Sequence, residues 1–139
     1  MSLESAIVNQ FRSYAPLAAL VGTRIYPVTY PQNATLPVVV YQRTSRLPEY
    51  SHDGDCGAAE SRFQISAFAK SYSVARQTAD AIHGALRPWE QTQFLDVTNA
   101  IRIGGVFMED EIDLYNPADV ETESDYQILA DYRFLFGEV

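Results

Sequence analysis

Residues 126–136, YQILADYRFLF, show the most regular alternation of side chains in the sequence. Along this stretch an apolar or aromatic residue stands at every second position: Tyr126, Ile128, Ala130, Tyr132, Phe134 and Phe136. The positions between them hold Gln127, Leu129, Asp131, Arg133 and Leu135. Successive side chains of a strand point to opposite faces, so this alternation predicts a long strand with one face against a core.

Shorter stretches with the composition of strands precede it, at residues 38–42, 62–69, 94–97, 100–103 and 106–115. The first is the β-branched run VVVYQ, which predicts an inner strand buried on both faces. The second alternates like the closing stretch and predicts a half-buried strand. Gly104 and Gly105 predict a turn or bulge just before the last of these stretches.

Two segments repeat apolar residues at helical spacing. The first follows the capping residue Ser2 and carries Leu3, Ile7, Phe11 and Tyr14. The second is capped by Ser71 or Ser73, is ended by Pro88, and carries Val74, Thr78, Ile82 and Leu86. A short turn at residues 16–21 is stopped by Gly22. Because helices and strands cluster rather than alternate, we predict one α+β domain over residues 1–139, a mainly antiparallel sheet covered by two α-helices.

Residues 47–58 lack periodicity and contain one Pro, two Gly, two Asp and one His. This composition predicts a long exposed loop, and long ordered loops on compact domains usually serve binding. The candidate contact residues on this loop are Glu49, Tyr50, His52, Asp53 and Asp55.

The negative charge is concentrated in one segment. The 139-residue chain has a formal net charge of −8, and residues 103–132 hold nine of the 18 acidic residues with no Lys or Arg. Such a segment repels phosphates, which argues against sequence-reading or duplex-clamping contacts with DNA. No apolar run reaches the length of a membrane span, no secretory signal begins the sequence, and the single Cys56 excludes an internal disulfide.

The acidic strand at residues 106–115 is the first candidate for a site. Strand alternation predicts that Glu109, Glu111 and Asp113 share one face and that Asp110 lies on the other. Three carboxylates on one face suit a hard cation, yet a solvated outer face is the more common arrangement. The sequence holds no nucleophile elbow, zinc motif, phosphate loop or dinucleotide fingerprint, so we expect neither an enzyme nor a cofactor or metal.

Several motifs in order resemble the tail-completion, or tail-terminator, family of long-tailed bacteriophages and prophages. They are GTRIYP at residues 22–27, PQ at 31–32, LPVVVYQ at 36–42, the FAK strand end at 68–70 with the following helix, and EDE with DLY at 109–115. Within these motifs, the signature residues that we expect to be structural are Gly22, Arg24, Tyr26, Pro27, Pro37, Tyr41, Asp110, Leu114 and Tyr115.

The resemblance implies a structural virion protein that forms a ring, commonly of six copies, at the head-proximal end of the tail tube. Such a ring ends tube polymerisation and offers a joining surface to the head. Its partners would be other copies of itself, the tail tube protein and a head-completion or connector protein, with DNA only passing through and no membrane. It would be assembled in the bacterial host cytoplasm. The alternatives are a head-completion or connector adaptor of a phage or prophage-derived particle and, last, a metal-dependent hydrolase that uses the acidic segment.

Within a ring, the acidic segment has two candidate roles. It would line the lumen and repel passing DNA, or it would meet arginines of a neighbouring protomer, in which case salt would weaken assembly. The candidate lumen or interface residues are Glu109, Glu111, Asp113, Glu121, Glu123 and Asp125. The sequence leaves both roles open.

Overall fold

The computed structural model describes residues 3–31, 34–51, 54–91, 94–96, 101–118 and 124–138. Its helices are α1 (Leu3–Ser13), α2 (Ala15–Val21) and α3 (Tyr72–Gln91). Its strands are β1 (Ile25–Pro27), β2 (Val38–Ser51), β3 (Gly54–Ala69), β4 (Phe94–Asp96), β5 (Ile101–Asn116) and β6 (Asp125–Glu138). No helix of this part of the chain is long and apolar enough to cross a membrane.

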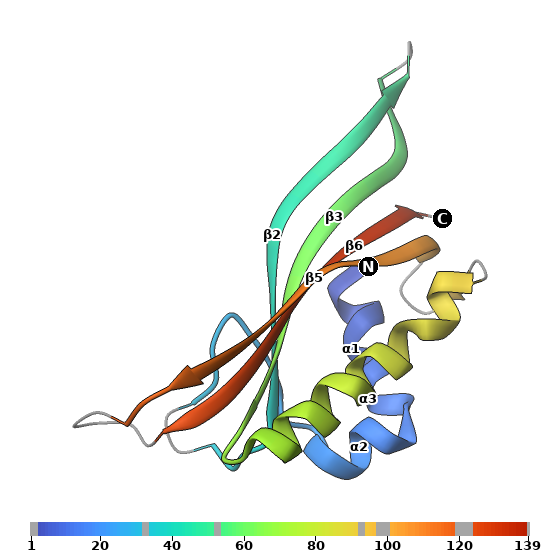
Figure 1. Ribbon diagram of the computed structural model, residues 1–139. Coiled ribbons are helices and arrows are strands. Elements are labelled where there is room, and N and C mark those ends of the chain that lie inside the picture. The colour runs from blue at the N-terminus through green and yellow to red at the C-terminus, as the bar shows by residue number, and fades with distance from the viewer. Residues whose placement is uncertain are drawn as a thin grey trace.

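The strands form one sheet in the order β1-β2-β3-β6-β5-β4. Every neighbouring pair is antiparallel except β1 and β2, which are parallel. All three helices lie on the same side of the sheet, and no helix of the described residues lies on its other side (Figure 1). The predicted α+β class is therefore confirmed, with a third helix: the short turn expected at residues 16–21 is α2.

The core lies between the helices and the sheet, and it uses the predicted stripes. Leu3, Ile7 and Phe11 of α1 are buried, as are Thr78, Ile82 and Leu86 of α3. From β6 the inward side chains are Ile128, Ala130, Tyr132, Phe134 and Phe136, all buried. Ser71 caps α3, because its hydroxyl oxygen accepts a hydrogen bond from the Val74 amide at 3.3 Å.

Two expectations about element ends were wrong. Helix α3 does not end at Pro88 but continues to Gln91, and Trp89 of this last turn is only 1% exposed. Burial of an indole of this size holds the turn against the core. Residues 47–58 are not a loop either, because β2 and β3 stay paired as far as Tyr50 with Asp55 and Ser51 with Gly54.

The reason for the second error is the position of β2 in the sheet. Strand β1 covers only Val39–Tyr41 of β2, so the rest of β2 is an edge strand, where a proline such as Pro48 is tolerated. A register shift between Pro48 and Tyr50 takes up the irregular sequence. Glu49, Tyr50 and Asp55 thus lie on paired strands that extend beyond the helices (Figure 1). His52 and Asp53 lie outside the described residues.

Candidate functional site

A β-bulge in β5 separates the acidic residues that the sequence placed on one face. Met108 pairs with Tyr132 and Asp110 pairs with the next residue, Asp131, so Glu109 is the extra residue of the bulge. After the bulge, Glu111 and Asp113 lie opposite Ala130 and Ile128, on the helix side of the sheet. Glu109 instead contacts residues on the side without helices. The prediction that Glu109, Glu111 and Asp113 share a face was therefore wrong.

Glu109 joins two arginines that face each other across the sheet. Arg62 of β3 and Arg133 of β6 are directly paired in register, an arrangement in which like charges repel. The Glu109 carboxylate lies 3.0 Å from Arg133 Nε and 3.7 Å from Arg62, and Glu60 lies 3.4 Å from Arg133. The bulge thus places the Glu109 carboxylate on the helix-free side, within reach of the two arginines that would otherwise repel each other.

Arg76 of α3 neutralises the two carboxylates on the helix side. Its guanidinium lies 2.7 Å from Glu111, 3.7 Å from Asp113 and 3.5 Å from Asp80. The Tyr72 hydroxyl donates a hydrogen bond of 2.8 Å to Asp113, and this bond raises the pKa of Tyr72. These contacts attach α3 to β5. Within the described residues, no group of three or more His, Cys, Asp or Glu side chains could hold a metal ion.

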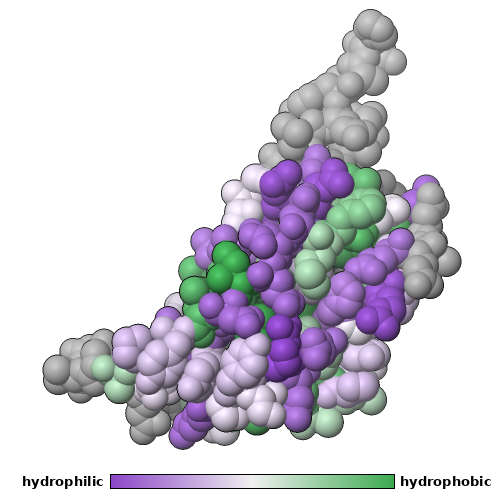
Figure 2. All heavy atoms as spheres, viewed as in Figure 1, coloured by the Kyte–Doolittle hydropathy of each residue, from purple (hydrophilic) through white to green (hydrophobic). Residues whose placement is uncertain are grey.

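Apolar side chains, by contrast, are exposed along β5. The described residues include seven exposed large hydrophobic side chains, of which five belong to this strand: Phe107, Met108, Ile112, Leu114 and Tyr115. Ile112 is 45% exposed and lies opposite Leu129, and Leu114 is 42% exposed and lies opposite Gln127. Figure 2 shows hydrophilic residues over the middle of one view of the molecule and smaller hydrophobic patches beside them. A strand on which Glu109, Glu111 and Asp113 are paired within the chain while Ile112 and Leu114 are exposed has the chemistry of an association surface.

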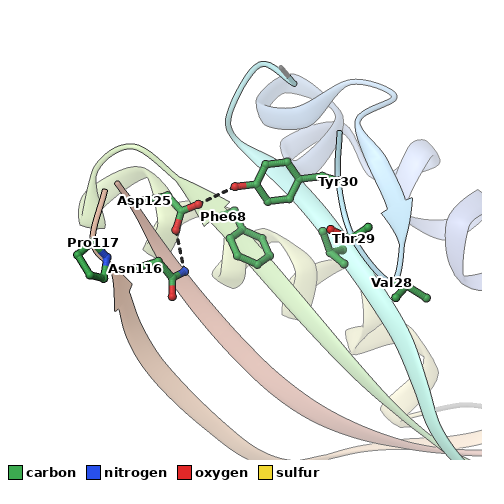
Figure 3. Close-up of a pocket in the computed structure, with 8 residues that line it drawn as sticks. Val28, Thr29, Tyr30, Phe68, Asn116, Pro117 and Asp125 are labelled. Atoms are coloured by element: carbon green, nitrogen blue, oxygen red, sulfur yellow. Dashed lines mark hydrogen bonds between the residues drawn. The ribbon is translucent and has the colours of Figure 1, made fainter. Parts of the chain in front are cut away.

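Asp125, another predicted lumen or interface residue, is buried at the start of β6 (Figure 3). It accepts hydrogen bonds from the Tyr30 hydroxyl at 2.6 Å and from the Asn116 side-chain amide at 2.7 Å. Burial and the bond to Asp125 raise the pKa of Tyr30 far above its usual range. Asp125 therefore ties the segment after β1 to the end of β5. Glu121 and Glu123 lie outside the described residues.

These three residues border an open pocket of about 260 Å³, whose apolar walls are Val28, Val40, Phe68 and Pro117. The Tyr30 ring packs on Phe68 at 5.0 Å between centroids. Val28 has a φ of 67°, and the Thr29 amide donates to the Pro27 carbonyl at 2.7 Å, which makes a γ-turn. A β-branched residue in this conformation is strained, so the rim of the pocket stores strain.

The signature residues fall into two groups, one around β1 and one on β5. Gly22 has a φ of 57°, the special backbone angle expected of it. Arg24 donates hydrogen bonds to the Leu20 carbonyl at 3.0 Å and the Pro37 carbonyl at 3.1 Å. Tyr26 and Pro27 lie in β1, and Tyr41 of β2 packs partly buried against the core. Asp110, Leu114 and Tyr115 all lie on β5.

The partners of the acidic residues were not apparent from the sequence. Arg62, Arg76 and Arg133 come from three other elements, and only the i to i+4 spacing of Arg76 and Asp80 was visible as a local signal. Tyr30 likewise reaches Asp125 across 95 positions of sequence.

The chain matches the family model described as "Tail completion protein gp17" over residues 5–131, and it therefore belongs to that family. A chain of a solved structure entitled "Virion of native gene transfer agent (GTA) particle" shares the fold, with a TM-score of 0.68 at 20% sequence identity. The superposition covers 98% of this chain and 96% of that one. No curated protein sequence matches.

Proposed function

We propose that the chain forms a ring of six copies at the head-proximal end of a phage tail tube. The ring ends tube polymerisation and presents the surface on which a head-completion or connector protein docks. Membership of a tail-completion family over residues 5–131 carries this proposal. The open sides of β2 and β5 support it, because a ring requires two different surfaces on each protomer that complement one another.

The chain acts in this role without catalysis. A metal-dependent hydrolase would need the carboxylates of β5 free to bind a cation. Glu111 and Asp113 are instead held by Arg76, and Glu109 is held by Arg62 and Arg133. DNA passes through the ring and is not specifically bound, because carboxylates outnumber arginines along β5 and its neighbours.

The test is to polymerise purified tail tube protein with and without this chain and to examine the tubes by electron microscopy. We expect added density at one end of each tube and shorter tubes as the ratio of chain to tube protein rises. Density along the tube walls, or tubes of unchanged length with bare ends, would refute tube termination.

A second candidate is a head-completion or connector adaptor, because the likeness to a chain of a whole virion does not fix a position in the particle. An adaptor would bind isolated connectors and leave tube ends bare. Incubating the labelled chain separately with tubes and with connector particles distinguishes the two.

A further inference from the structure

The sheet ends on both sides in long stretches of strand without a partner strand. At one side, β1 pairs only with Val39–Tyr41 of β2, and at the other, β4 pairs only with Ile101–Ile103 of β5. Within the described residues, no strand pairs with the outer side of residues 42–51 or of residues 104–116. Each stretch therefore offers backbone amides and carbonyls to another chain.

The free stretch of β5 carries the bulge at Glu109 but lacks two other devices that protect an edge strand in a monomer. Residues 104–116 contain neither lysine nor proline, which are the usual blocks to edge pairing. Their carboxylates at Glu109, Glu111 and Asp113 are held by arginines of the same chain, while Ile112 and Leu114 are exposed on the helix-free side. Such an edge is suited to being covered in an assembly.

We propose that the outer side of β5 pairs with the outer side of β2 in a second copy of this chain, a step that rests on the ring function proposed above. The directions of the strands support a second copy of the chain as the partner of β5. The four long strands alternate in direction in the order β2-β3-β6-β5, so a copy placed beside the first by rotation presents β2 antiparallel to β5. The alternation then continues from copy to copy, as a closed head-to-tail ring requires.

Charge supports the same occupant. Residues 42–51 contain Arg43, Arg46 and Glu49, a formal charge of +1, whereas residues 104–116 contain four acidic residues and no basic ones, a formal charge of −4. A β5 edge would repel another β5 edge and attract a β2 edge. This difference favours head-to-tail pairing over a two-fold dimer.

The register of the sheet places two side chains that can form a hydrogen bond, Gln42 and Asp110, in the same row across the strands. Gln42 pairs with Gln64, Gln64 with Asp131, and Asp131 with Asp110, so Gln42 and Asp110 stand in the same row on opposite edges. Asp110 and Asp131 are like charges directly opposite one another. In a ring without stagger, residues 42–47 of a neighbour would stand opposite residues 105–110, and the Gln42 amide would donate a hydrogen bond to this carboxylate pair.

A closed sheet of this kind fits the placement of the helices. Six copies would contribute about 24 long strands, and a strand spacing of ~4.8 Å then gives a circumference of roughly 115 Å. The helices occupy one side of the sheet only, so they would lie outside, and the helix-free side would line the lumen (Figure 1). Glu60, Glu109, Asp110 and Asp131 would then face the DNA together with Arg62 and Arg133.

The test is disulfide cross-linking in a Cys56→Ser background, which removes the one native cysteine. The double variant Gln42→Cys/Asp110→Cys should give a ladder of linked species on a non-reducing gel when the chain is bound at tube ends. Each single variant should run as a monomer. A stagger between neighbouring copies would shift Gln42 along β5 by two residues. The second double variant, Gln42→Cys/Ile112→Cys, tests that register. Unchanged circular dichroism of each variant confirms that it is folded.

Three results would overturn the inference. The first is wild-type chain at tube ends without a ladder from either double variant. The second is a linked dimer from Asp110→Cys alone, which would indicate two-fold β5 pairing. The third is a linked product of the mass expected for chain plus tube subunit, which would make the tube protein the occupant. Wild-type chain that neither binds tubes nor self-associates would instead refute the proposed function, and the inference with it.

Discussion

The two sides of strand β5 differ in how far their side chains find partners within the protomer. On the helix side, the carboxylates of Glu111 and Asp113 are bound by Arg76, and the strand is attached to α3. On the other side, the bulge at Glu109 pairs the local charges and leaves Ile112 and Leu114 exposed. Three of the four carboxylates on this strand are therefore paired within the protomer, and apolar area together with the open backbone edge is left for assembly.

The first way to test this difference is a pair of neighbouring residues on β6. Ile128 faces the helices and is 1% exposed, whereas Leu129 faces the other way and is half-buried. We expect Ile128→Ala to lower the free energy of unfolding by about 2 to 5 kcal/mol and Leu129→Ala by under about 1.5 kcal/mol. Urea unfolding of the monomer measures both. Equal losses would mean that the helix-free side is packed as tightly as the core.

Removal of the Arg76 guanidinium should have the next largest effect. Arg76→Ala leaves Glu111 and Asp113 close together without a cation, and we expect a loss of about 1 to 2 kcal/mol because the group is only partly buried. Adding Glu111→Gln and Asp113→Asn to this variant should recover much of the loss. A triple variant no more stable than Arg76→Ala would show that Arg76 acts by packing rather than by charge.

The Tyr30 to Asp125 hydrogen bond predicts a dependence on pH. Because burial and Asp125 raise the pKa of Tyr30, the folded chain keeps this proton at a pH where the unfolded chain loses it. Unfolding free energy should therefore fall as pH rises above about 10. Tyr30→Phe should cost about 1 kcal/mol at neutral pH and make this decline less steep.

Tyr132 provides the comparison for Tyr30, since burial raises its pKa as well. Tyr132→Phe should also flatten the decline above pH 10. Denaturant titrations between pH 8 and 11 measure the slopes, and a Tyr30→Phe slope equal to that of the wild type would contradict the role given to Asp125.

The smallest effect is expected from single charges at the bulge. Glu109→Gln should cost about 0.5 to 1 kcal/mol, because it leaves Arg62 and Arg133 opposite each other without a carboxylate between them. Asp110→Asn is the matched control. It removes one of two opposed carboxylates and should change stability by less than about 0.5 kcal/mol. Thermal unfolding at low salt measures both, and the reverse order would mean that the bulge does not serve to place Glu109.

The parts of the fold that sequence predicted were those set by local periodicity. The alternation of residues 126–136 and the stripes of α1 and α3 gave the sheet, two of the helices and most of the core. The paired β2 and β3 strands beyond residue 47 were missed because proline, glycine and polar residues are typical of loops and equally acceptable at a sheet edge.

The site was less accessible from the sequence than the fold. Acidic residues on β5 could be identified, but a bulge at Glu109 shifts every later side chain to the other face, and nothing within residues 106–115 marks its position. The partners Arg62, Arg76 and Arg133 depend on the packing of separate elements. Local spacing therefore could not show whether these carboxylates were free.

The most direct test of the account is the mass of the chain in solution, measured by light scattering over a wide concentration range at low and high salt. Wild-type chain should reach a plateau at about 94 kDa, six times the 15.6 kDa protomer, and high salt should shift this plateau to higher protein concentration, because the opposite charges of the β2 and β5 edges favour their pairing. A wild-type chain that is monomeric at every concentration and also gives no linked ladder at tube ends would contradict the account.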